Sequence, residues 1–118
     1  MSIVTDLLIR PGVIAAGEYT YKQELSYYNG NITLEQARLL AIMCYTTTKE
    51  LVMEGDMIAT LNPREERRPP RAWVLRGPER TLCVVANVFC LFDNSKGSFN
   101  KIFGFMRQAL ANETLDLV

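Results

Sequence analysis

The sequence predicts a single α+β domain in which helices cover both faces of one sheet. The length of 118 residues suits one domain with a real hydrophobic core. The apolar patterning follows the order helix, strand, strand, long helix, three strands, helix. The last two strands are apolar on both faces, so helices must cover both sides of the sheet.

A short helix and a hairpin open the chain. Residues 2–10 predict a helix that Ser2 caps and a Pro-Gly pair ends. The unbroken apolar run over residues 13–17 predicts a strand that is covered on both faces. The more polar residues 24–28 predict a second strand, which turn residues end. We expect the two strands to pair, with the second at an edge of the sheet.

The central element is a long helix over residues 33–58. Thr33 and Gln36 predict a capping box, in which the threonine hydroxyl accepts from the backbone N–H of Gln36 and the glutamine side chain reaches back. Gly55 is a weak point near the end of this helix. One stripe with a 3.6-residue period is expected to face the sheet: Ala37, Leu40, Ala41, Cys44, Thr48, Leu51 and Val52.

The second half of the chain supplies three strands and a helix. Residues 62–71 are a charged, proline-rich connection, which excludes helix and central strand. Ala86-Asn87 predicts a tight turn between the last two strands, and Ser98 caps an amphipathic helix. Residues 112–118 are expected to form a loosely held tail. The three strands are expected over residues 72–76, 81–85 and 88–92.

One segment of the long helix carries more apolar surface than a single copy of the chain can cover. Leu39 to Tyr45 are seven consecutive apolar positions, and no charge lies between Arg38 and Lys49. A helix that is apolar nearly all round is normally buried on more than one side. We therefore expect a second copy of the protein to cover the face that is turned away from the sheet.

The composition argues against catalysis and metal binding. The chain has no histidine, which removes the commonest general base and zinc ligand. Its three cysteines lie in apolar surroundings without a metal-site spacing, as expected of reduced cysteines in a cytoplasmic protein. No P-loop or GxGxxG motif is present, so the chain is not itself a GTPase. We expect a non-enzymatic cytoplasmic protein that needs neither a metal nor a cofactor.

The charge distribution argues against a membrane or nucleic-acid partner. Thirteen basic residues balance thirteen acidic ones, and no stretch is long enough to span a bilayer. The basic excess is confined to residues 64–80. Its arginines are either a solvated loop that Glu65 and Glu66 partly neutralise or a site for an acidic protein surface, which we favour over nucleic acid. This candidate partner-binding cluster is Arg64, Arg67, Arg68 and Arg71.

Several segments resemble the roadblock/dynein light chain family. They are the helix entering "PGVIAAGEY", the strand ending in "YYNG", the Thr-capped long helix, and "RTLCVVANVFCLFDNSKGSFNKIF". These segments are similar in sequence to an uncharacterised bacterial roadblock-like subgroup. The resemblance spans roughly residues 3–106. It implies a three-layer, profilin-like fold with a five-stranded antiparallel sheet in the order 2-1-5-4-3. The long helix would lie on one face, and the two terminal helices on the other.

The resemblance also implies a role. Proteins of this family typically act as homodimeric scaffolds or regulators, often of small GTPases and motility complexes. Their third strands pair edge to edge and their long helices lie side by side, which corresponds here to residues 72–76 and 33–58. The adjacent prolines Pro69 and Pro70 would shorten the pairing edge. The residues expected in the dimer interface are Leu39, Ile42, Met43, Thr46, Trp73, Val74 and Leu75.

Alternatives remain open at some of these positions. Trp73 either anchors a partner or lies in the core beneath a helix. Met43 belongs to an adaptable binding surface or to the core. Tyr27 and Tyr28 line a pocket or an ordinary sheet face. The core is the commoner place for a methionine such as Met43.

Two other function classes compete with the scaffold. A small-molecule sensor of profilin-like or PAS-like type would use a cavity lined by Trp73, Tyr27 and Cys90. An enzyme would use Cys83 or Cys90 as its nucleophile. Apolar neighbours raise the pKa of a thiol and make it inert, which argues against the enzyme.

Overall fold

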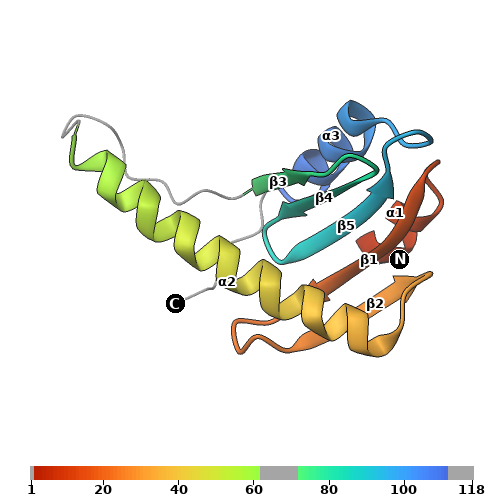
Figure 1. Cartoon of the computed structure of the whole chain (residues 1–118), viewed down its shortest axis with the longest axis horizontal. Helices are drawn as coiled ribbons and strands as arrows, with labels where there is room; N and C mark the ends of the chain where they lie inside the picture. The colour runs from red at the N-terminus through yellow and green to blue at the C-terminus, as the bar shows by residue number, and fades with distance from the viewer. Residues whose placement is uncertain (1, 62–71, 112–118) are drawn as a thin grey trace.

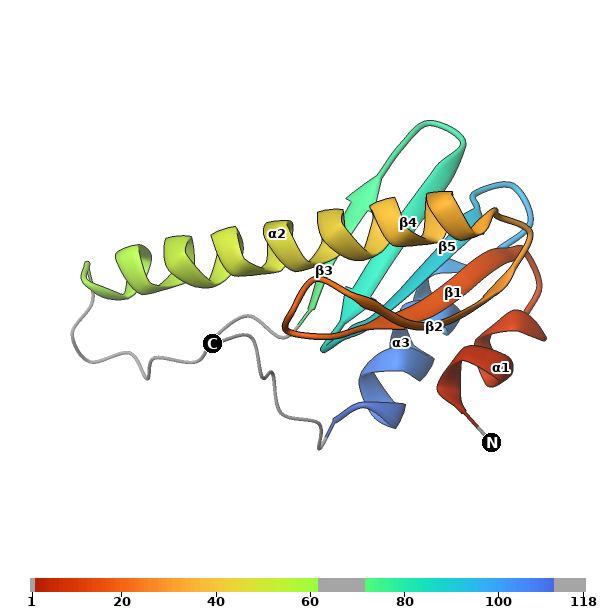
Figure 2. The same cartoon turned by 90° about the horizontal axis from the view of Figure 1, so that it is seen from below.

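The computed structural model describes residues 2–61 and 72–111. Within them a five-stranded antiparallel sheet lies between two helical layers, with α2 on one face and α1 and α3 on the other (Figures 1 and 2). The strand order is β2-β1-β5-β4-β3. The elements are α1 (Ile3–Leu8), β1 (Val13–Tyr19), β2 (Leu25–Gly30), α2 (Leu34–Ala59), β3 (Ala72–Arg76), β4 (Arg80–Val85), β5 (Val88–Asp93) and α3 (Phe99–Ala109).

Every element expected from the sequence is present, and the differences lie at the ends. β1 continues to Tyr19, two residues beyond the strand expected over residues 13–17. The reason is tertiary: Tyr19 is fully buried against α2, and it pairs with Leu25 across the hairpin. α2 runs through Gly55 without a break and ends at Ala59. The expected tight turn at Ala86-Asn87 is confirmed, with Ala86 at a φ of 52°.

The helix caps form as their residue types predict. Thr33 Oγ1 accepts from the backbone N–H of Gln36 at 3.1 Å, and Gln36 Oε1 accepts from the N–H of Thr33 at 2.9 Å. Ser2 caps α1, and Ser98 caps α3. Each cap satisfies backbone donors that the first helical turn leaves unpaired.

The sheet separates two hydrophobic clusters. The cluster between the sheet and α1 and α3 includes Val4, Phe92 and Met106. The cluster between the sheet and α2 includes Tyr19, Cys44 and Phe89. Both faces of β4 and β5 are therefore buried, which explains why their sequences are apolar without alternation.

A close approach of two loops fixes the end of the sheet near α1. Gly12 has a φ of +85°, and a Cβ added there would lie 2.4 Å from the backbone nitrogen of Gly97. The backbone N–H of Asp93 donates to Gly12 O at 2.9 Å. Glycine is required at position 12 both for its backbone conformation and for the space.

Candidate protein-interaction surface

The outer face of α2, turned away from the sheet, carries large exposed apolar side chains. Leu39 is 61% exposed and Ile42 is 44% exposed, whereas Ala41 and Cys44 on the sheet side are fully buried. Leu39, Thr46 and Met53 are spaced seven residues apart, the repeat that lets two helices pack along a common seam. We define the outer face of α2 as Leu39, Ile42, Met43, Thr46, Met53 and Met57.

The C-terminal part of α2 projects beyond the sheet (Figures 1 and 2). Its apolar residues are exposed, with Met57 at 66% and Ile58 at 62%. A helix that lacks tertiary packing is marginal in water, because most helical stability in proteins comes from an amphipathic face against a core. The overhanging turns are therefore a second stretch of α2 whose apolar side chains are exposed in the single chain.

The outer edge of β3 lies beside this helix. Within the described residues β3 pairs with β4, and its other edge is unpaired. Leu75 on β3 is 56% exposed. A groove of 340 Å³ runs between α2 and the β3–β4 hairpin and is lined mainly by apolar side chains. Its apolar lining is Leu40, Met43, Leu75, Leu82 and Leu91.

The structure distributes the expected interface residues over both faces of β3. Trp73 lies on the α2 side, half-buried, and its Nε1 donates to Thr48 Oγ1 at 2.7 Å. Of its two sequence interpretations, the structure therefore favours the tryptophan beneath a helix. Val74 is half-buried on the opposite face, in the cluster with α1 and α3. Leu39, Ile42, Met43, Thr46 and Leu75 are exposed.

The expected arginine cluster, Arg64, Arg67, Arg68 and Arg71, lies outside the described residues, as do Pro69 and Pro70. Two further arginines of the basic segment are described. Arg76 and Arg80 line the groove beside β3, and the Arg76 guanidinium lies 4.7 Å from the centre of the Phe99 ring. The Arg76 guanidinium thus lies on the α3 side of the sheet, and Arg80 is the other basic residue that lines the groove.

The cysteines are placed for packing. Cys44, Cys83 and Cys90 are fully buried, and burial raises the pKa of each thiol to about 12. A thiol with so high a pKa is almost entirely protonated at neutral pH and is a poor nucleophile. Among residues 2–61 and 72–111, no cluster of histidine, cysteine or acidic side chains suits a metal ion. The helices of the same residues include none with the length and apolar character to cross a bilayer.

The three residues expected to line a sensor cavity are not brought together. Cys90 belongs to the cluster on the α1 and α3 side, whereas Trp73 belongs to the cluster on the α2 side. Tyr27 is 44% exposed on β2, at the far edge of the sheet. That lining was wrong because a β-strand alternates faces, and residues from different strands share a cavity only if they share a face.

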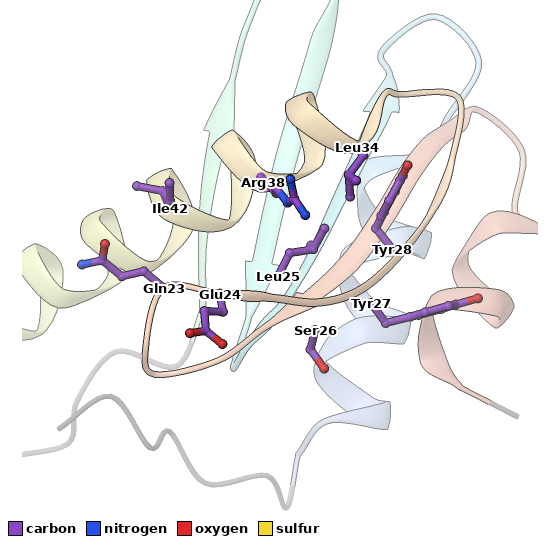
Figure 3. Close-up of a pocket in the computed structure, with 9 residues that line it drawn as sticks. All are labelled: Gln23, Glu24, Leu25, Ser26, Tyr27, Tyr28, Leu34, Arg38 and Ile42. Carbon is purple, nitrogen blue, oxygen red and sulfur yellow. The ribbon is translucent and has the colours of Figure 1, made fainter.

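A second groove lies between β2 and the first half of α2 (Figure 3), and it agrees with the alternative in which Tyr27 and Tyr28 line a pocket. Its volume is 630 Å³, and Tyr27 and Tyr28 are part of its lining. Leu34, Arg38 and Ile42 line it from α2. The spacing of four residues places these three on one side of the helix, a signal that the sequence interpretation did not use.

Known structures share this fold. A roadblock/LC7 domain from Streptomyces avermitilis has a TM-score of 0.63 and 11% identity, covering 92% of both chains. MglB from Myxococcus xanthus has a TM-score of 0.68 and 12% identity, covering 94% of this chain and 84% of the other. A gliding protein MglB from Thermus thermophilus has a TM-score of 0.73 and 13% identity, covering 93% of this chain and 81% of the other.

Sequence comparison places the chain in a family. No curated protein matches it significantly. A family model described as "Uncharacterized conserved protein (DUF2173)" matches residues 3–108. That match includes all eight helices and strands of the described residues except the last residue of α3. The chain belongs to the family described as "Uncharacterized conserved protein (DUF2173)", and its fold is roadblock-like.

Proposed function

We propose that this protein is a non-enzymatic homodimeric scaffold or regulator that works by binding other proteins, and that a small GTPase is a candidate partner. The observation that carries the proposal is the exposed apolar outer face of α2. Soluble monomers seldom expose a contiguous row of large apolar side chains unless that row binds something. On the outer face Leu39, Ile42 and Met43 lie together, and Met53 and Met57 follow beyond Thr46; these five apolar side chains are each at least 36% exposed.

Pairing of two copies would bury this row most simply. Two α2 helices lying side by side would place Leu39 and Met43 against their counterparts, with the seven-residue spacing supplying a common seam. Removing apolar area from water contributes about 25 cal/mol per Å². The free edge of β3 lies next to the same groove, so edge-to-edge pairing of the two β3 strands would extend the contact.

The proposed partner contacts border the surface used for self-pairing, since Arg76 and Arg80 line the same groove as Met43 and Leu75. The resemblance to roadblock proteins favours a small GTPase or a multiprotein complex as the partner class. The basic segment around Arg76 and Arg80 supports an acidic protein surface, because complementary charges at the rim of an interface speed association. The deeply buried cysteines, with thiol pKa values of about 12, support a role without catalysis.

The oligomeric state tests the proposal. At tens of micromolar, light scattering is expected to give the mass of two chains, each of 13.4 kDa. Leu39→Glu and Met43→Glu are expected to yield monomers, because the dimer would bury an unpaired charge. Ile9→Glu is the matched control, since Ile9 is 80% exposed at the end of α1 on the other side of the sheet. A monomeric wild-type protein would refute the proposal.

A further inference from the structure

The groove between β2 and α2 is a second candidate binding site, which borders the outer face of α2 and shares Ile42 with it. Figure 3 shows Leu25 and Tyr28 of β2 pointing toward α2, and Leu34 and Arg38 of α2 on the opposite wall. Ile42 lies farther along the helix, above Gln23 in the turn that precedes β2. The groove therefore has two walls that run alongside each other, and each wall combines apolar with polar side chains.

A bulge in β2 produces this arrangement. β1 advances by one residue from Glu18 to Tyr19, while β2 advances by two from Tyr27 to Leu25, so Ser26 is the extra residue. A bulge changes the direction in which neighbouring side chains point. Leu25 and Tyr28 consequently face α2 together, while Ser26 and Tyr27 point to the other side (Figure 3).

The edge of β2 leaves backbone groups free to pair. The N–H of Asn31 donates to Ile14 O at 2.8 Å, which sets the alternation of hydrogen-bonded and non-bonded residue pairs along β1 and β2. By this alternation the backbone N–H and C=O of Tyr28 point away from β1. β2 is also the edge strand opposite to β3 in the sheet. An extended segment lying in the groove can therefore form backbone hydrogen bonds to Tyr28.

The spacing of side chains on α2 matches an extended segment. Leu34, Arg38 and Ile42 follow one another at intervals of four residues, which is about 6 Å along a helix axis. Alternate residues of a strand are about 6.6 Å apart and point to the same side. Three alternate side chains of a bound strand would thus lie opposite these three residues in turn.

Arg38 sets the chemistry of the central position. It is exposed, and no ion pair or hydrogen bond joins its guanidinium to another of the described residues. Glu24 is the acidic residue of the lining, and it points away from Arg38 in Figure 3. The planar guanidinium, which lies between Leu34 and Ile42, favours a carboxylate as its partner. It can form two parallel hydrogen bonds to that group.

We infer that the β2–α2 groove binds an extended segment of a partner protein in which an acidic residue has an apolar residue two positions away on each side. The acidic side chain pairs with Arg38, and the apolar ones pack against Leu34 and Ile42. This inference rests on the proposed function in that the protein acts by binding other proteins. The site itself does not require a dimer, because Arg38 lies about 100° around the helix from Leu39.

Selection from a library of random linear nonapeptides, displayed on phage, tests the inference with the full chain. Enriched peptides are expected to share the pattern apolar, any, acidic, any, apolar. A fluorescent copy of the best peptide is expected to bind Arg38→Gln about tenfold more weakly than wild type, the loss typical of one charge-assisted hydrogen bond. Lys49→Gln, a cation removed from the exposed side of the same helix outside the groove, is the control and should bind as wild type does.

Reversing the charge at position 38 and at the centre of the peptide distinguishes specific pairing from nonspecific attraction. Arg38→Glu is expected to reject the acidic peptide and to bind the same peptide with lysine at its centre. Light scattering on the Arg38→Glu protein is expected to match wild type, so loss of peptide binding is not loss of the proposed dimer. No common pattern among the enriched peptides, or equal binding by Arg38→Glu and wild type, would overturn the inference.

Other occupants are distinguished in the same assay. A synthetic peptide of residues 112–118 of this chain is added as a competitor. It is expected to leave the selected peptide bound; displacement at equal concentration would mean that the groove serves the chain's own C-terminal segment. Nuclear magnetic resonance shifts on peptide addition are expected at Leu25, Tyr28 and Arg38, and shifts confined to Leu39, Met53 and Met57 would place the peptide elsewhere.

Discussion

The indole nitrogen of Trp73 donates a hydrogen bond to the hydroxyl oxygen of Thr48 at 2.7 Å and so joins the edge strand β3 to the middle of α2. Tyr19 Oη lies 3.3 Å from the same hydroxyl and donates to Ala86 O at 3.2 Å. Since the tyrosine proton goes to Ala86, the Thr48 hydroxyl donates to Tyr19. This chain of bonds links α2 to β1, β3 and the turn between β4 and β5.

Thr48→Val is expected to destabilise the protein by about 1–2 kcal/mol. Valine has nearly the same shape as threonine, but it leaves the N–H of Trp73 without its acceptor in a half-buried position. Urea unfolding followed by far-ultraviolet circular dichroism, at one fixed protein concentration, measures the change in the free energy of unfolding.

A double-mutant cycle isolates the bond itself. In the Trp73→Phe background, which lacks the indole donor, Thr48→Val is expected to cost less than it does in the wild type, because only the contact with Tyr19 is then lost. Equal costs in the two backgrounds would mean that the hydrogen bond from Trp73 contributes nothing to stability.

Two glycine substitutions are expected to change stability in opposite directions. Gly12→Ala should destabilise the protein by more than about 2 kcal/mol, because its φ is +85° and the new Cβ would lie 2.4 Å from Gly97 N. Gly104→Ala should stabilise it by about 0.5–1 kcal/mol, because Gly104 is exposed within α3 and nothing lies within 4 Å of its added Cβ. Thermal unfolding of both variants compares the two effects; a stable Gly12→Ala would contradict the close approach.

The sequence predicted the elements of the fold because its local signals agreed with one another. The capping box at Thr33, the two-sided apolar runs of β4 and β5, and the turn at Ala86-Asn87 each depend on neighbouring residues alone. The strand order came from the resemblance to roadblock proteins, since no local pattern states which strands are adjacent. The extension of β1 to Tyr19 was missed because it depends on contacts with distant parts of the chain.

The candidate sites were predicted less completely than the fold. The apolar segment from Leu39 to Tyr45 was visible in the sequence, and the structure places Leu39 outward and Tyr45 in the core. The β2–α2 groove depends on the bulge at Ser26, which periodicity alone does not reveal. The placement of Trp73 depends on Thr48, a partner 25 residues away in the chain.

The three thiols are expected to resist modification in the folded protein. Burial raises the pKa of Cys44, Cys83 and Cys90 to about 12, so almost no thiolate is present at pH 8. A chromogenic disulfide reagent should react slowly with the native protein and fully with all three in urea. Rapid reaction of one thiol without denaturant would show that its strand or helix opens locally.

Stability is expected to fall in alkaline solution. In the unfolded chain a thiol ionises near its ordinary pKa of 9.0, whereas in the folded protein the thiols stay protonated up to about pH 12. The unfolded state therefore binds fewer protons between these values, and the free energy of unfolding decreases as pH rises above about 9. Tyr19, with its pKa raised by burial from 10.0 to about 12, adds to the upper part of this decrease. Urea midpoints from pH 7 to pH 11 measure it, and Cys44→Ala should show a shallower slope.

The overhanging end of α2 is expected to be protected from hydrogen exchange only when two copies associate. Met53 and Met57 are more than 60% exposed in the single chain, so these turns lack the packing that stabilises the first half of the helix. Pairing along the outer face of α2 would cover them, so exchange of the amides of residues 53–59 should slow as the protein concentration rises. Leu39→Glu should exchange quickly in this segment at every concentration, while core amides such as that of Phe89 remain protected. Fast exchange in the wild type at all concentrations would mean that a second copy does not reach this part of the helix.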